Sequence, residues 1–317
     1  MRMYLLALLT LSTSCIAHAD TLTYDTTIFG TNLATGAVGM RDVGSGNLTI
    51  SGIPAGGTVT QTNLYWHGPT NSTDPNFNAN VTVAGQSVTG TNIGFASDNF
   101  WDSANSQAYQ ANVTSIINGN GTYALSNFQK PNALINGAAA FSFYNSGVST
   151  GKQDVILYHG NDSNFASAFD AAGWNFTAND INYSGGSASL TLYVSDGQNF
   201  GANDDGTLTV NGHVLATGGI FQGLAPRAPG AGVANGDLTD VVMFDLTPFL
   251  APGVNNLNIQ LTPGFDDALS LVAAGVAVPA GSAPQPSAVP EPATLSLFGV
   301  ALAASGLFRM RSKRNAS

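Results

Sequence analysis

Cysteine is almost missing from the 317 residues, and its single occurrence, Cys15, lies in the apolar segment that begins the chain. The rest of the chain therefore has no thiol chemistry, no cysteine-ligated metal site and no disulfide. A chain of this length can do without disulfides, because it is long enough to fold around a sizeable hydrophobic core.

Glutamate and the cations are also scarce. Of the 19 acidic residues 18 are Asp, and the single Glu is Glu291. Residues 20–290 contain four cations and carry a net charge near −14. The four are Arg41, Lys130, Lys152 and Arg227. A field of this sign repels nucleic acid and phosphorylated ligands, so neither is an expected partner.

The near-absence of Glu also bears on catalysis. A glycosidase needs two carboxylates with separated pKa values, and here only Asp could supply them. The pairs Asp204–Asp205 and Asp266–Asp267 are chain neighbours and suit turns better. The sequence shows neither a cysteine nucleophile nor a phosphate-binding loop. We therefore expect no enzymatic activity.

Helical periodicity is hard to find outside the two ends, whereas alternation of apolar and polar residues is widespread. Ala188, Leu190, Leu192 and Val194 put one apolar face on a strand, with polar residues between them. Clusters rich in Gly, Asn and Pro, such as 52–57 and 118–121, separate the strands and predict turns. Many short strands with Gly-rich turns indicate an all-β sandwich or barrel.

The body also repeats itself at an offset of about 128 residues. Three segments recur in the same order, which indicates duplicated domains rather than a solenoid. The pairs are Leu64–Tyr65 with Leu192–Tyr193, 81–85 with 208–212, and 112–119 with 245–253. We predict two tandem β-sandwich domains, residues 20–165 and 166–278, with the boundary where alternation lapses between 161 and 178.

The segments 208–213 and 245–257 resemble galactose-binding-type jelly rolls. Across both copies the order of motifs is similar to a two-lobed domain of unknown function on archaeal and bacterial surface proteins. The segments that carry this resemblance are 112–125, 138–162 and 187–212. It implies jelly-roll-like sandwiches at a cell surface and brings no settled activity with it, since its motifs are mostly turns and core positions.

The first 19 residues predict a secretory signal helix. Arg2 is a positive start, an apolar run follows, and Ala17 and Ala19 are the small residues before a cut after Ala19. The alternative, lipidation of Cys15, requires an aliphatic residue three positions earlier, where Ser12 stands. At the other end, residues 279–288 are rich in Pro, Ala and Ser and predict a semi-rigid extended linker.

The tail that follows, residues 289–314, has three parts. Val289 and the run Pro290-Glu291-Pro292 form a short extended handle, because proline fixes φ and cannot enter a helix interior. Residues 293–308 are apolar and predict a short transmembrane helix of ~24 Å, against a hydrocarbon core of ~30 Å. Four cations end the tail and favour the cytoplasmic side. They are Arg309, Arg311, Lys313 and Arg314.

This arrangement resembles the PEP-CTERM sorting signal of exported proteins in Gram-negative bacteria. The resemblance implies processing by an exosortase-type membrane enzyme and a transient anchor in the inner membrane. It also implies final delivery to the cell surface or the exterior, which is rich in polysaccharide. We expect a non-enzymatic surface or matrix protein associated with exopolysaccharide or biofilm. The alternatives are an adhesive module that binds carbohydrate or calcium and, more distantly, a hydrolase.

Two loops are candidate binding sites. Residues 196–206 are the densest acidic loop and offer oxygen ligands for calcium, the one candidate cofactor, although Asx-turns need the same residue types. Its candidate ligands are Asp196, Asn199, Asn203, Asp204 and Asp205. Trp101 lies among polar residues and is a candidate for sugar contact, although a Trp in a sandwich is more often part of the core. The three histidines that follow the signal segment, His67, His159 and His213, lack the spacing of a zinc site.

Overall fold

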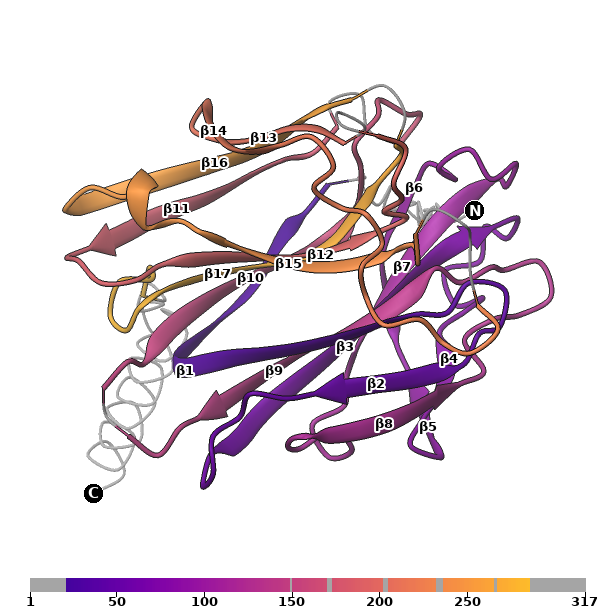
Figure 1. The fold of residues 1–317 in the computed structure, drawn as a ribbon, viewed down its shortest axis with the longest axis horizontal. Helices are drawn as coiled ribbons and strands as arrows, with labels where there is room; N and C mark the ends of the chain where they lie inside the picture. The colour runs from indigo at the N-terminus through magenta and orange to yellow at the C-terminus, as the bar shows by residue number, and fades with distance from the viewer. Residues whose placement is uncertain are drawn as a thin grey trace, which may run out of the picture. The chain divides into compact units, whose positions relative to one another are not determined.

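A computed structural model describes residues 21–285, except 149, 170–172, 202–204, 232–235 and 265–266. The signal segment with Ala17 and Ala19, and the tail 289–314 with its helix 293–308, lie outside the described residues. Within them every regular element is a β-strand apart from the 3₁₀ turn η1 (Thr247–Phe249). This confirms the all-β prediction (Figure 1). No helix in the described part of the chain is long and apolar enough to cross a membrane.

The first nine strands form what we call the first lobe. They build two antiparallel layers with the orders β1-β9-β3-β7-β6 and β2-β8-β4-β5. The strands are β1 (Thr23–Gly39), β2 (Gly46–Ile50), β3 (Thr58–Thr70), β4 (Asn80–Val83), β5 (Gln86–Thr89), β6 (Thr91–Ala96), β7 (Asn105–Asn112), β8 (Gly121–Ser126) and β9 (Gly137–Asn145).

The last eight strands form the second lobe. Their layers have the orders β15-β12-β17-β10 and β11-β16-β13-β14. The strands are β10 (Gln153–Ser163), β11 (Asn175–Tyr183), β12 (Ser189–Ser195), β13 (Gly206–Val210), β14 (His213–Thr217), β15 (Thr239–Asp245), β16 (Gly253–Pro263) and β17 (Ser270–Pro279). If β6 is set aside, each lobe has eight strands in the orders 1-8-3-6 and 2-7-4-5. The two lobes thus share one arrangement of eight strands in two layers.

Strand β1 joins the lobes. Its first part, Thr23 to Thr31, pairs with β10, and its second part, Asn32 to Gly39, pairs with β9. The larger layers of the two lobes therefore form one nine-stranded sheet with β1 in its middle. Because this sheet folds back on itself at β1, its two halves face each other, and the body has four layers (Figure 1).

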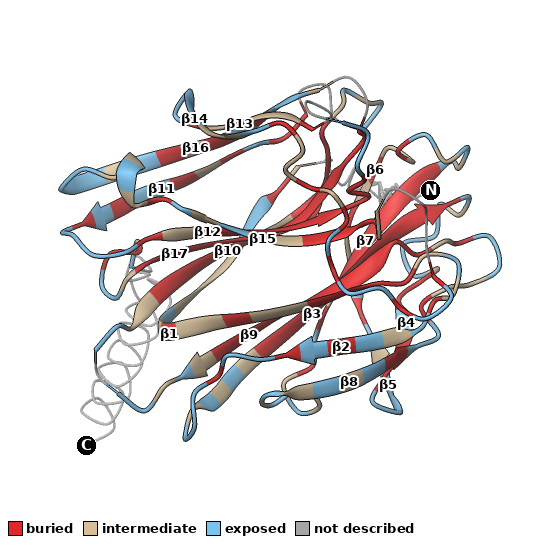
Figure 2. Cartoon of the chain, in the orientation of Figure 1, coloured by how far each residue is buried: buried red, intermediate tan, exposed pale blue. Residues whose placement is uncertain are grey.

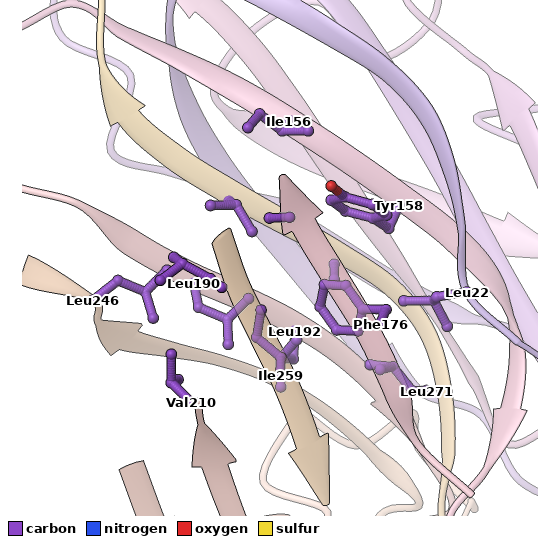
Figure 3. Packing of buried hydrophobic residues seen from close by; sticks show 14 of the residues in the cluster. Leu22, Ile156, Tyr158, Phe176, Leu190, Leu192, Val210, Leu246, Ile259 and Leu271 are labelled. Atoms are coloured by element: carbon purple, nitrogen blue, oxygen red, sulfur yellow. The ribbon is translucent and has the colours of Figure 1, made fainter. Parts of the chain in front are cut away.

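Three hydrophobic cores separate the four layers. In the first lobe Leu64 points into the core under the β2-β8-β4-β5 layer, whereas the next residue, Tyr65, points into the central core between the lobes. The second lobe repeats this, with Leu192 in its own core and Tyr193 in the central one. Figure 3 shows part of the core of the second lobe. Both faces of the middle of the large sheet are thus covered, and β3, β7, β9, β10, β12 and β17 are mostly buried along their length (Figure 2).

Local hydrogen bonds confirm the sequence repeat. At the end of β7 the Val113 amide donates to the Thr62 carbonyl at 2.8 Å, and the Thr62 amide donates to Thr114 Oγ1 at 2.9 Å. After β15 the Leu246 amide donates to the Ala188 carbonyl at 2.9 Å, and the Ala188 amide donates to Thr247 Oγ1 at 3.1 Å. These are the same bonds in the second copy.

The hairpin turns match as well. Between β4 and β5, Ala84 and Gly85 have φ of 47° and 78°, and between β13 and β14, Asn211 and Gly212 have φ of 52° and 78°. Positive φ at both central residues is the geometry of a type I′ turn, whose twist suits a tight hairpin.

The division into lobes differs from the predicted boundary at residue 165. The second lobe begins with β10 at Gln153, so the change of lobe falls in residues 146–152. The lapse of alternation between 161 and 178 instead marks the passage from β10 in one sheet to β11 in the other. Since β1 belongs to both halves of the large sheet, residues up to 283 form one compact unit.

The predicted linker also begins later than residue 279. Pro279 is the last residue of β17, and Ser282 and Ala283 are buried against the body. The Asn182 amide donates to the Ser282 carbonyl at 2.8 Å, which fixes this segment beside β11. Within the described residues, therefore, only Pro284 and Gln285 follow the compact unit.

The shared sheet predicts that the two lobes unfold together. Leu64→Ala and Leu192→Ala remove equivalent, fully buried side chains from the two outer cores. Each should lower the free energy of unfolding by about 2–5 kcal/mol. Both should shift the same single transition in urea denaturation followed by circular dichroism. Two separate transitions, each moved by only one of the substitutions, would contradict a shared unit.

Candidate functional site

The two loops that the sequence singled out lie together at the junction of the lobes. One is the 97–104 loop between β6 and β7, and the other is the 196–205 loop between β12 and β13. With the β16–β17 connection they enclose a hollow of about 260 Å³. Its lining residues are Asn99, Phe100, Trp101, Asp196, Gln198, Phe200, Asp267 and Ala268.

Asp196 is the polar centre of this site. Its side chain is buried, and its carboxylate accepts hydrogen bonds from Trp101 Nε1 at 2.8 Å and from Asn136 Nδ2 at 3.3 Å. Burial raises the pKa of Asp196 well above its usual value, and the Trp101 hydrogen bond and the charge of Arg41 offset only part of this. The carboxyl therefore ties the 97–104 loop of the first lobe to the end of β12 in the second.

Trp101 connects this carboxyl to a cation. The Arg41 guanidinium carbon lies 3.9 Å from the centre of the indole ring, a cation–π contact that covers one ring face. The ring is half-buried, and its N–H is used by Asp196. The predicted sugar-contact residue thus lies in the hollow, but much of its surface is occupied by other parts of the chain.

Sequence reasoning missed the neighbouring aromatic. Phe100 is 77% exposed, although it precedes Trp101 directly. Asn99 and Phe100 have φ of 55° and 67°, so the backbone turns sharply there and sends adjacent side chains in different directions. The sequence shows that Phe100 and Trp101 are adjacent. It does not show which of the two rings faces solvent. Phe200, 49% exposed, lines the same hollow.

The predicted calcium ligands have other partners. Asp196 is used as described above, and Asp205 accepts from the backbone N–H groups of Phe221, at 2.7 Å, and Ile220. Asn199 is exposed, and Asn203 and Asp204 lie outside the described residues. In the part of the chain that is described, no three His, Cys, Asp or Glu side chains gather to hold a metal ion. Calcium binding by this loop stays a prediction.

Asp240 holds backbone segments next to this site. It lies on β15, opposite Val194, and accepts from the Gly223 amide at 2.7 Å and the Leu224 amide at 2.9 Å. Gly197 packs against it so closely that an added Cβ would lie 2.2 Å from Asp240 Oδ2. Burial raises the pKa of Asp240 to about 6, while the two backbone hydrogen bonds pull it down.

The three histidines lie on different strands, His67 on β3, His159 on β10 and His213 on β14. His67 is fully buried in the central interface, where Nδ1 lies 2.7 Å from Ser195 Oγ, and burial lowers its pKa to about 3. His159 lies 3.5 Å from Asp25, and His213 lines a separate hollow with Phe249. They do not converge on one site.

Two carboxyls, Asp196 and Asp267, line the same hollow, and both accept hydrogen bonds from the chain itself. Residues 147–151 read Gly-Val-Ser-Thr-Gly, the spacing of a nucleophile elbow, but Ser149 lies outside the described residues. The elbow requires a strand followed by a helix, whereas the element that follows here is strand β10. Of the acidic pairs, Asp204 and Asp266 lie outside the described residues, and Asp267 accepts from the Gln198 amide at 2.8 Å.

The Trp101–Asp196 hydrogen bond can be tested with Trp101→Phe, which keeps a ring beneath Arg41 but removes the N–H donor. A buried carboxyl oxygen would lose its donor, so the free energy of unfolding should fall by about 1–3 kcal/mol. In an Asp196→Ala background, which has no side-chain acceptor, the same change should cost less, which a double-mutant cycle in urea would measure. Strictly additive costs would show that the two side chains are not coupled.

The raised pKa of Asp240 predicts a pH-dependent effect of Asp240→Asn. The folded carboxyl binds its proton up to about pH 6, whereas the unfolded one releases it near 3.8. Ionisation of Asp240 therefore removes stability from the wild type as pH rises from about 4 to 6, by up to about 3 kcal/mol. The variant lacks this loss, so relative to wild type it should gain stability between pH 4 and 7.5. A difference that stays constant across urea titrations at these pH values would contradict the shift.

Comparison with known proteins gives one match, at the end of the chain. Residues 288–313 match the PEP-CTERM protein-sorting motif. Searches of curated proteins and of solved structures each gave no match. The body, a β-sheet protein by its structure, thus has no named relative to lend it a function. The chain carries a tail motif that implies export, processing by an exosortase and sorting to the cell surface.

Proposed function

We propose that this is a non-enzymatic protein of the cell surface or extracellular matrix, associated with exopolysaccharide or biofilm. In this proposal the signal segment directs export, and the tail holds the protein in the inner membrane for a time. An exosortase-type enzyme then processes the tail and releases the body. The observation that carries the proposal is the motif match at residues 288–313.

The composition of the body supports an exterior location. Its net charge near −14 keeps it soluble and repels nucleic acid, so the expected partners are the processing enzyme, the membrane and neutral matrix material. Stability comes from three buried cores rather than from disulfides.

The non-enzymatic part of the proposal rests on how the buried carboxyls are used. Asp196, Asp205 and Asp240 accept hydrogen bonds from the chain itself, which gives them a role in holding loops. A general acid or base has to reach a substrate proton. The second candidate function, a module that binds carbohydrate or calcium, is favoured by the hollow beside Trp101 and would operate at the same location. A hydrolase is the third.

The sorting proposal predicts the effect of changing Pro290-Glu291-Pro292 to three alanines. A processing enzyme that reads this handle should leave the variant uncut in the inner membrane, whereas a permanent anchor depends on residues 293–308 and the basic end. The measurement is immunoblotting of membrane, surface and medium fractions in the native host.

A second Pro-x-Pro triplet lies six residues before Pro290-Glu291-Pro292 and provides a matched control. Pro284-Gln285-Pro286 has the same spacing of two prolines without the acid, and its change to three alanines should leave processing normal. Normal processing and release of the Pro290-Glu291-Pro292 variant would overturn the sorting proposal. Retention of both variants would instead indicate that the length or stiffness of the linker matters.

A further inference from the structure

We infer that the hollow beside Trp101 binds a single neutral sugar ring of a polysaccharide, held between Phe100 and Phe200 and hydrogen-bonded by Asn99. This inference deepens the proposed function, because it names the chemistry by which the body would associate with a matrix. It rests on the size, the lining and the charge of the hollow, and on where it lies in the duplicated fold.

The size suits one ring. The hollow has a volume of about 260 Å³, just below the ~300–1,000 Å³ of pockets that take drug-sized ligands. Its rim carries two large apolar side chains that folding has left in water, Phe100 at 77% and Phe200 at 49% exposure. Phe100 is held edge-on against Phe165, with ring centres 5.9 Å apart. Exposed aromatics gathered at a hollow mark a binding site more often than isolated ones do.

One buried polar atom in the hollow lacks a partner. Asn99 is 5% exposed, and its Nδ2 donates to Ser270 Oγ at 3.0 Å. Its Oδ1 has no hydrogen-bond partner among the described residues. The Asn99 side chain also lies within hydrogen-bonding reach of Asp196. Buried amide oxygens are usually satisfied, so the Oδ1 atom can accept one further donor. A ligand hydroxyl in the hollow would supply it.

The charges favour a neutral ligand. The acidic body disfavours phosphate and carboxylate groups, and the nearby cation, Arg41, already lies on the Trp101 ring. A cationic ligand would need carboxylates, yet Asp196 accepts from Trp101 and Asn136, and Asp267 accepts from the Gln198 amide. A pyranose ring combines an apolar C–H face, which suits aromatic rings, with hydroxyls that donate to an amide oxygen.

The hollow lies where the two lobes differ. Strand β6 is the one described strand without a counterpart in the second lobe, and the loop after it supplies Asn99, Phe100 and Trp101. The second lobe completes its two layers without such a strand. The additional strand and loop are therefore not required by the fold itself, which is consistent with a role in binding.

The test is a fluorescence titration of the full chain, purified in detergent, with neutral hexoses, deoxyhexoses and their oligosaccharides. Trp66 and Trp174 are buried, so the half-buried Trp101 should dominate any change on binding. We expect saturable binding of at least one of these sugars. Phe100→Ala and Phe200→Ala should each weaken it about tenfold. Val254→Ala, which truncates a 71% exposed side chain at the start of β16, is the matched control and should bind as wild type.

The role of Asn99 is tested on the ligand, so that the loop stays intact. Deoxy analogues of the best sugar should include one that binds about tenfold more weakly to wild type, because it no longer donates to the amide oxygen. Absence of sugar binding at millimolar concentration, equal binding by Phe100→Ala, or a response to calcium alone would each overturn the inference. Tail processing is scored separately, so a body that binds no sugar but is normally released leaves the sorting proposal standing.

Discussion

The central constraint on this fold is that both faces are covered over the middle of its nine-stranded sheet. The sheet reverses at β1, which pairs with β10 through its first half and with β9 through its second. Alternate side chains of β3 and β12 therefore enter different cores: Leu64 and Leu192 the outer ones, Tyr65 and Tyr193 the central one. A lobe on its own would leave the outer face of its larger layer in water. Here that face is what joins the lobes.

The duplication explains the geometry of the central interface. The divergence of the two copies explains which side chains now meet there. His67 and Ser195 occupy equivalent positions, as shown by their offset of 128 residues, and they are hydrogen-bonded to each other at 2.7 Å. Equivalent residues can meet only near a two-fold axis that relates the lobes. A neutral histidine beside a serine satisfies the contact without a buried charge, which is consistent with the lowered pKa of His67.

Sequence patterns predicted the features that depend on local order. Alternation indicated the strands, and the recurrence of 81–85 as 208–212 indicated the paired hairpins that β4–β5 and β13–β14 form. The position of the lobe boundary could not be predicted, because the Gly- and Ser-rich residues 146–152 have the composition of any turn between strands, whereas the longer lapse of alternation comes one strand later. Alternation reports which residues face a core, and it is silent on which of three cores they face.

The candidate site could be predicted from the sequence even less completely than the lobe boundary. The 97–104 and 196–205 loops were each conspicuous in the sequence, but nothing in their composition predicts that they meet, since their contact depends on the reversal at β1. In the folded chain these residues have roles that the sequence did not predict. Asp196 accepts a hydrogen bond from Trp101, and Phe100 is the aromatic residue exposed to solvent. The sorting tail is the opposite case, because an enzyme that reads a short extended handle reads contiguous residues. The sorting motif is therefore encoded locally in this chain, whereas the hollow in the body depends on contacts between residues about 100 positions apart, such as Trp101 and Asp196.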